Sequence, residues 1–90
     1  MERRQEDEVA ATLRAVLADV LGLDEARVDR FDESTQLFGA LPEFDSMAVA
    51  GLLTELEERL GILIEDHEVD TEMLESFGSL LAFLRAKAAG

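Results

Sequence analysis

Apolar residues recur at steps of three and four in three separate stretches of the chain, which is the spacing of helices that each bury one face. The pattern predicts a first helix over residues 6–21, a second over residues 46–60 and a last helix over residues 77–87. Asp70 is expected to cap a one-turn helix that runs through Leu74. The sequence therefore predicts an all-α fold with three longer helices and one short helix.

Residues that typically end or begin helices stand at the borders of these stretches. Gly22 and Gly61 follow the last apolar turns of the first two helices, where a residue in the left-handed conformation commonly ends a helix. The second helix is expected to begin at Asp45 or Ser46, because both side chains can accept a hydrogen bond from an amide of the first turn. Ser76 is expected to cap the last helix in the same way.

The faces predicted to be buried consist of aliphatic residues with one aromatic residue. They are Val9, Leu13, Val16, Leu17 and Val20 in the first helix, Met47, Ala50, Leu53, Leu56 and Leu60 in the second, and Leu80, Leu81, Phe83 and Leu84 in the last. Aromatic residues make up only 6% of the chain, which favours packed helices over a sheet. We interpret these faces as core, and the lining of a ligand channel stays open as the alternative.

The connection between the first and second helices, residues 24–45, is long and has no sustained helical period. Structureless loops of this length are uncommon in compact domains, so we expect an ordered loop with one short helical turn. Its isolated apolar residues are expected to pin it to the helix faces; they are Val28, Phe31, Leu37, Phe38 and Leu41. The apolar run at residues 62–64 is likewise predicted to be a loop packed on the core.

The net charge of the chain and the length of its apolar runs indicate which partners and which location to expect. The chain of 90 residues has 21 acidic and 8 basic side chains, a net charge of −13 and a pI near 4.2. This field repels nucleic acid and favours proteins with basic patches. The N-terminus is charged and no apolar run reaches membrane-spanning length, so we expect no membrane span and a cytoplasmic protein. Residues 1–90 are predicted to form one domain, a monomer.

Few residues in the chain are suited to catalysis or metal binding. There is no cysteine, and the single histidine, His67, lies in an acidic loop without a second histidine at metal-ligand spacing. Ser46 is not in a Gly-x-Ser-x-Gly elbow, and no glycine-rich phosphate loop occurs. The acidic residues are spread over the whole chain and are interpreted as solvated surface. No metal site or catalytic residue is predicted, and an enzyme is not expected.

The string LPEFDSM at residues 41–47 places a serine behind an aspartate at the predicted start of a helix. A phosphate ester on Ser46 would lie near free backbone amides and the positive end of the helix dipole. Around Asp45-Ser46-Met47 the sequence resembles the acyl carrier protein family, whose second helix begins with Asp-Ser-Leu or Asp-Ser-Met after a long loop. Further matches are Leu37-Phe38, Leu53, the run at residues 56–62 and Ser76-Phe77, so the resemblance spans nearly the whole chain.

The resemblance implies an acyl-carrier-like four-helix bundle with a long loop between its first and second helices. It implies that a phosphopantetheinyl transferase uses coenzyme A to attach 4′-phosphopantetheine to Ser46, and that the arm's thiol holds an acyl group as a thioester. Asp45 would place the serine for the transferase. Ligases or synthases of lipid or fatty-acid biosynthesis would load the arm, and other enzymes would accept its cargo. Met47, Ala50 and Thr54 would form an exposed and partly apolar rim that partner enzymes and the acyl chain touch. Glu57 and Glu58 would add the acidic part of this rim.

Three residues depart from the family pattern, and several alternatives stay open. Glu43 stands where the family usually has glycine, and Ala48 and Gly51 stand where fatty-acid carriers tend to have acids. These differences indicate partners other than the usual ones. The motif also resembles D-alanyl (aminoacyl) carriers and carriers found beside exosortase-type sorting systems. From another class, the chain is compatible with an acidic helical adaptor without a prosthetic group, in which Ser46 is only a helix cap.

Overall fold

The computed structural model describes residues 2–89, with side chains from Glu8 onward. Its helices are α1 (Glu2–Leu21), α2 (Glu25–Asp29), α3 (Ser46–Leu60), α4 (Thr71–Glu75) and α5 (Phe77–Ala89), with a 3₁₀ helix, η1 (Asp66–Glu68), before α4. No strand occurs among these residues, apart from an isolated bridge between Gln36 and Ser76. The predicted all-α class is confirmed, and α2 is the helical turn expected in the long connection.

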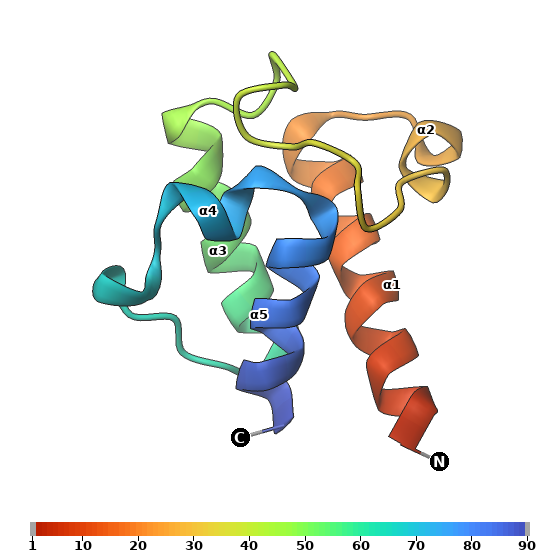
Figure 1. Ribbon diagram of the computed structural model, residues 1–90, viewed down its shortest axis with the longest axis vertical. Helices are drawn as coiled ribbons and strands as arrows, with labels where there is room; N and C mark the ends of the chain where they lie inside the picture. The colour runs from red at the N-terminus through yellow and green to blue at the C-terminus, as the bar shows by residue number, and fades with distance from the viewer. Residues whose placement is uncertain (1, 90) are drawn as a thin grey trace.

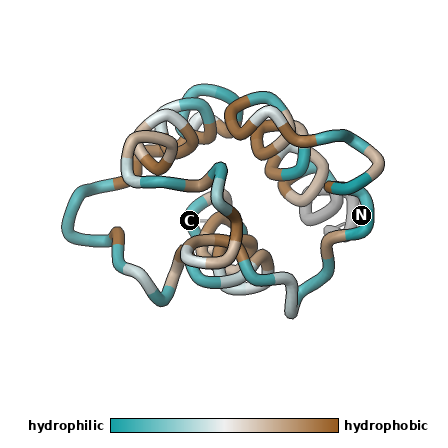
Figure 2. The backbone as a smooth tube through the Cα atoms, turned by 90° about the horizontal axis from the view of Figure 1, so that it is seen from above, coloured by the Kyte–Doolittle hydropathy of each residue, from teal (hydrophilic) through white to brown (hydrophobic). Residues whose placement is uncertain are grey.

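The three long helices, α1, α3 and α5, lie around one common core (Figure 1). The two ends of the chain lie at one end of the bundle, while the connection from α2 to α3 crosses the opposite end. Seen along the bundle, the hydrophobic positions of the helices turn toward the space between them (Figure 2). The start of α3 is therefore at the end of the molecule that the long connection covers.

The core consists of aliphatic side chains from every α-helix and from the long connection, with three phenylalanines. Its buried members are Val9, Leu13, Val16, Leu17, Leu21, Leu23, Val28, Phe31, Leu37, Phe44, Leu52, Leu56, Ile64, Met73, Leu74, Phe77, Leu80, Leu81 and Leu84. The faces predicted for the first and last helices are confirmed, with Val20 and Phe83 packed at their margins.

The buried face predicted for the second helix is confirmed at Leu56, with Leu53 and Leu60 packed at the edge of the core, and is wrong at the start of the helix. Met47 is 85% exposed and Ala50 is also exposed, whereas Leu52 and Leu56 are completely buried. The helical period itself was correct, but α3 packs mainly against α1, and Leu52, which is not in the predicted face, belongs to the buried core. A stripe with apolar residues on several sides does not by itself select the face that is buried.

The predicted helix ends are confirmed by their backbone geometry. Gly22 and Gly61 have φ of 69° and 65°, the left-handed conformation that ends α1 and α3. Asp45 is the cap of α3, and Asp70 caps α4 by accepting a 2.8 Å hydrogen bond from the amide of Met73. The capping by Ser76 is confirmed, because its hydroxyl accepts a 3.1 Å hydrogen bond from the amide of Ser79.

Backbone hydrogen bonds fasten the long connection to the junction between α4 and α5. The amides of Phe77 and Gly78 donate to the carbonyls of Thr35 (2.8 Å) and Glu33 (3.1 Å). In the other direction, Leu37 donates to the carbonyl of Glu75 at 2.8 Å. The predicted anchors Val28, Phe31 and Leu37 are buried, and Phe38 and Leu41 pack at the edge of the core. The connection is thus ordered along its length by paired backbone groups.

One side chain links α1 to α2 and α5. The Arg14 guanidinium donates a 2.7 Å hydrogen bond to the carbonyl of Val28 and lies 4.6 Å from the ring centroid of Phe77. The carbonyl of Val28 also accepts a 3.0 Å hydrogen bond from the amide of Phe31, so Arg14 adds a second donor at the end of α2.

The predicted packing of residues 62–64 is correct for two of the three residues. Ile64 is buried and Ile62 is half-buried, but Leu63 is 67% exposed. An extended segment turns successive side chains to opposite sides, so the middle residue of the run faces away from the core.

Gly78 is required where the connection crosses α5. A Cβ there would lie 2.7 Å from the carbonyl oxygen of Glu33, whereas a Cβ at Gly51 would meet only Val20, at 3.7 Å. Alanine is favoured over glycine in helices by about 1 kcal/mol. We therefore expect Gly51→Ala to raise the free energy of unfolding by up to about 1 kcal/mol and Gly78→Ala to lower it by about 1 to 3 kcal/mol. Urea denaturation measures both; equal shifts in the same direction would contradict this packing.

Candidate functional site

Ser46 is the first residue of α3, and its side chain is exposed. The preceding residue, Asp45, has extended backbone angles (φ −96°, ψ −176°), and its carboxylate accepts a 2.9 Å hydrogen bond from the amide of Ala48. The sequence did not decide whether Asp45 or Ser46 caps α3. In the structure the cap is Asp45. The hydroxyl of Ser46 is therefore not needed to start the helix.

The first turn of α3 suits a negatively charged group on Ser46. The helix has 15 residues, and the amides of its first residues have no carbonyl acceptor within the helix. Asp45 binds only the third of these amides, that of Ala48. The amides of Ser46 and Met47 and the positive end of the helix dipole remain at the surface, where they favour a phosphate ester.

A shallow groove of about 260 Å³ begins at Ser46 and runs between α3 and α4. It is mainly apolar, and its lining residues are Phe38, Ser46, Val49, Val69, Asp70, Thr71 and Leu74. A larger hollow of about 370 Å³ lies between α1 and α2 and does not include Ser46. Of these two hollows, only the groove between α3 and α4 has Ser46 in its lining.

The loop before Ser46 is held by two residues whose role the sequence did not reveal. Phe44 is 2% exposed, and its ring packs edge-on against Phe38 with centroids 5.6 Å apart. Glu43 forms an ion pair with Arg27 of α2 at 3.4 Å. The loop needs no left-handed residue at position 43, where the family usually has glycine. The available signal for the Phe44 anchor was an aromatic side chain between charged residues, the same kind of signal that Phe31 gave.

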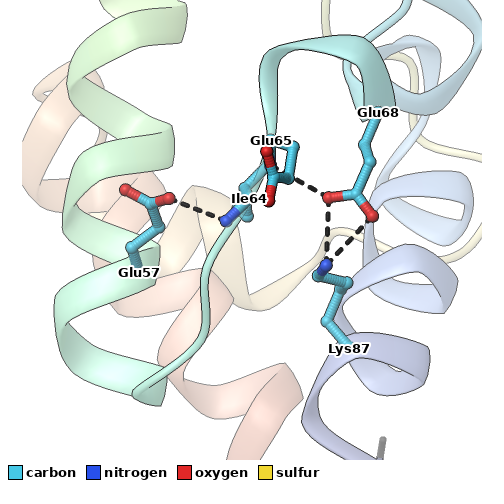
Figure 3. Close-up of polar contacts among 5 residues, drawn as sticks. All are labelled: Glu57, Ile64, Glu65, Glu68 and Lys87. Carbon is cyan, nitrogen blue, oxygen red and sulfur yellow. Dashed lines mark hydrogen bonds and ion pairs between the residues drawn. The ribbon is translucent and has the colours of Figure 1, made fainter.

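The segment that leads from α3 to the groove is held by carboxylates (Figure 3). Glu57 accepts a 2.7 Å hydrogen bond from the amide of Ile64. Glu68 accepts one from the amide of Glu65 (2.9 Å) and forms an ion pair with Lys87 of α5 (2.9 Å). The Glu65 amide, followed by the Lys87 ammonium group, lowers the pKa of the Glu68 carboxyl below its usual value. These contacts position Val69 and Asp70, which line the groove.

The residues predicted to face partners do not share one environment. Met47, Ala50, Thr54 and Glu58 are exposed along α3, starting next to Ser46. Glu57 is half-buried, and its carboxylate is bonded to Ile64 as described above. The structure therefore places four of the five predicted residues on an open face of α3.

Other kinds of site were sought in the part of the chain that the structure describes. Among residues 8–89, whose side chains the structure describes, there is no group of three or more side chains placed to hold a metal ion. His67 is exposed in η1. None of the described helices is long and apolar enough to cross a membrane.

Comparison with known proteins identifies a matching family and a similar solved structure. The model of the phosphopantetheine attachment site family matches residues 11–84. Among solved structures, the solution NMR structure of a holo acyl carrier protein from Nitrosomonas europaea is similar, with a TM-score of 0.81 and 36% sequence identity. The match covers 91% of this chain and 96% of that chain.

The helical bundle, the exposed serine and these matches define a carrier protein rather than an enzyme. The chain belongs to the phosphopantetheine attachment site family, and 4′-phosphopantetheine is its prosthetic group. The comparisons give no support to the D-alanyl carrier or to the adaptor without a prosthetic group.

The assignment of Asp45 as the cap of α3 can be tested by substitution. Asp45→Ala removes the acceptor of the Ala48 amide and is expected to lower the free energy of unfolding by about 1 kcal/mol. Asp45→Asn keeps an acceptor oxygen and is expected to lower the free energy of unfolding by no more than a few tenths of the loss expected for Asp45→Ala. Urea denaturation of the two variants provides the measurement. An equal loss for alanine and asparagine would show that the carboxylate acts through something other than capping.

The contacts of Glu68 predict a pH dependence of stability. Its pKa is lowered in the folded protein, so its contribution is complete above the pKa of the unfolded chain and is lost as pH falls through the folded pKa. At neutral pH, wild type is therefore expected to have a higher free energy of unfolding than Glu68→Gln. This difference is expected to shrink as the pH falls below the ordinary range of glutamate pKa values. Denaturation at a series of pH values measures the difference. A gap that widens toward acid would contradict the assignment.

Proposed function

We propose that Ser46 carries the 4′-phosphopantetheine arm, and that the chain holds acyl groups on this arm as thioesters and presents them to other enzymes. The observation that carries the proposal is the exposed hydroxyl of Ser46 at the first turn of α3, beside an apolar groove. The helix is capped by its neighbour Asp45, so the serine is free to be modified without loss of the cap.

The residues around Ser46 fit the arm. The amides at the start of α3 are available to a phosphodiester on the serine oxygen, and Asp45 fixes the backbone from which this oxygen projects. When bound, the arm supplies a thiol that holds the acyl group, and the chain itself has no cysteine. The groove between α3 and α4 offers apolar surface next to the attachment point.

The surface that partners touch is proposed to follow α3 from Ser46. Met47, Ala50 and Thr54 form its first turns, and Glu58 adds an exposed acid farther along. Glu57 supports the same surface by holding the following segment at Ile64.

Several kinds of enzyme are expected to bind the carrier. They are a phosphopantetheinyl transferase, a ligase or synthase that loads the arm, and the enzymes that accept the cargo. The net charge of −13 favours enzymes with basic patches, because opposite charges speed the encounter. Residues 1–90 are proposed to act as one monomeric carrier domain. The cytoplasmic location stays a prediction.

Intact-mass spectrometry tests the attachment at Ser46. Incubation with a phosphopantetheinyl transferase and coenzyme A is expected to raise the mass of wild type by one phosphopantetheine and to leave Ser46→Ala unchanged. Ser34→Ala, which alters another exposed serine in the long connection, is the matched control and is expected to be modified like wild type. Modification of Ser46→Ala, or no modification of wild type by several transferases, would contradict the proposal.

A further inference from the structure

The groove between α3 and α4 is an apolar surface that starts at Ser46. Its lining includes the aliphatic side chains of Val49, Val69 and Leu74 and the aromatic ring of Phe38. Because Ser46 itself belongs to the lining, a group carried on the arm can fold back into the groove. The groove therefore offers an acyl chain a surface that is partly shielded from water.

The groove is small for an acyl chain. Its volume is about 260 Å³, which is space for about eight or nine groups of the size of a water molecule or a methylene, taking about 30 Å³ for each. The end of the arm takes part of this space. The remainder accommodates an acyl group of about four to six carbons.

Two stacked phenylalanines close the inner side of the groove. Phe38 lines the groove and is half-buried, while Phe44 is 2% exposed and does not belong to the lining. Because the two rings pack edge-on with centroids 5.6 Å apart, Phe44 lies behind Phe38 as seen from the groove. Leu37, which precedes Phe38, is completely buried. A chain that extends inward beyond the groove must therefore displace closely packed side chains.

The α4 helix, which forms one wall of the groove, is tied to its surroundings. The carbonyl of Leu74 accepts a 3.1 Å hydrogen bond from the amide of Phe38 in the long connection. The hydroxyl of Ser79 in α5 donates a 2.9 Å hydrogen bond to the carbonyl of Met73. An outward movement of α4 that widened the groove would break these bonds and leave their polar groups unpaired.

We propose that Phe44, through its contact with Phe38, limits the cargo of the groove to acyl groups no longer than about six carbons. The proposal rests on attachment of the arm at Ser46. A short acyl chain gains stabilising contacts with each methylene that enters the groove, and a longer chain extends into water once the groove is full. Phe44 thus determines the length of the cargo rather than its attachment.

Thermal denaturation of loaded carriers provides the test. A promiscuous phosphopantetheinyl transferase and acyl-coenzyme A thioesters from acetyl to decanoyl load wild type, Phe44→Ala and Phe44→Leu, and intact-mass spectrometry verifies the loading. Phe31→Leu is the matched control, because Phe31 is also a buried phenylalanine of the long connection but stacks on Phe77 and does not line the groove. The gain in melting temperature is measured relative to the same protein with the unloaded arm, so that the loss of stability caused by each substitution cancels.

For wild type, the gain is expected to increase from acetyl through butyryl to hexanoyl and to level off at octanoyl and decanoyl. In Phe44→Leu and Phe44→Ala the gain is expected to keep increasing to octanoyl or beyond, since a smaller side chain leaves space into which Phe38 can move. Phe31→Leu is expected to level off at the same cargo as wild type. Phe44→Leu, the milder substitution, decides the outcome if Phe44→Ala does not fold.

A wild-type gain that continues to rise through decanoyl, or the absence of any gain, would overturn the proposal. The same holds for a plateau at one cargo length in both wild type and Phe44→Leu, and for a shift of the plateau in Phe31→Leu as large as that in Phe44→Leu. If no acyl-coenzyme A loads wild type, attachment at Ser46 is refuted together with the limit on cargo length.

Discussion

The pairing of the long connection with the α4–α5 junction is the constraint on which the rest of the structure depends. Four backbone hydrogen bonds join residues 33–38 to residues 74–78, and they satisfy polar groups that the connection would otherwise bury unpaired. Gly78 permits this close approach because it has no Cβ to meet Glu33. With the connection held here, Leu37 and Phe44 close the end of the core, and the chain reaches the start of α3 in a defined position.

The residues that stabilise the fold are different from the residue that is proposed to carry the arm. The buried residues are apolar throughout, and no described polar or charged residue is classed as buried. Charged side chains that do contact one another, such as Glu68 and Lys87, lie near the surface and hold the segment beside the groove. Ser46 takes no part in the core or in the cap of its helix, so a large group can be attached to it while the bundle stays folded.

Much of this structure could be predicted from the sequence, because its signals are local. Helical spacing and the stop residues Gly22 and Gly61 predicted the long helices, and the string around Ser46 predicted the site. The helical pattern could not predict which apolar face of α3 is buried, nor the bond from Ile64 to Glu57, since both depend on how α3 and the following segment pack against other helices. The Phe44 anchor was missed for the same reason: its partner, Phe38, is set by tertiary contact.

We propose that Ser46 is the one residue that carries the arm in the living cell. Peptide mapping by tandem mass spectrometry, on the protein isolated from the cells that produce it, tests this most directly. The account predicts fragment ions that place 4′-phosphopantetheine on Ser46, in free-thiol or acylated form. An arm found on another hydroxyl residue, such as Ser34 or Ser79, or a chain that carries no arm at all, would contradict it.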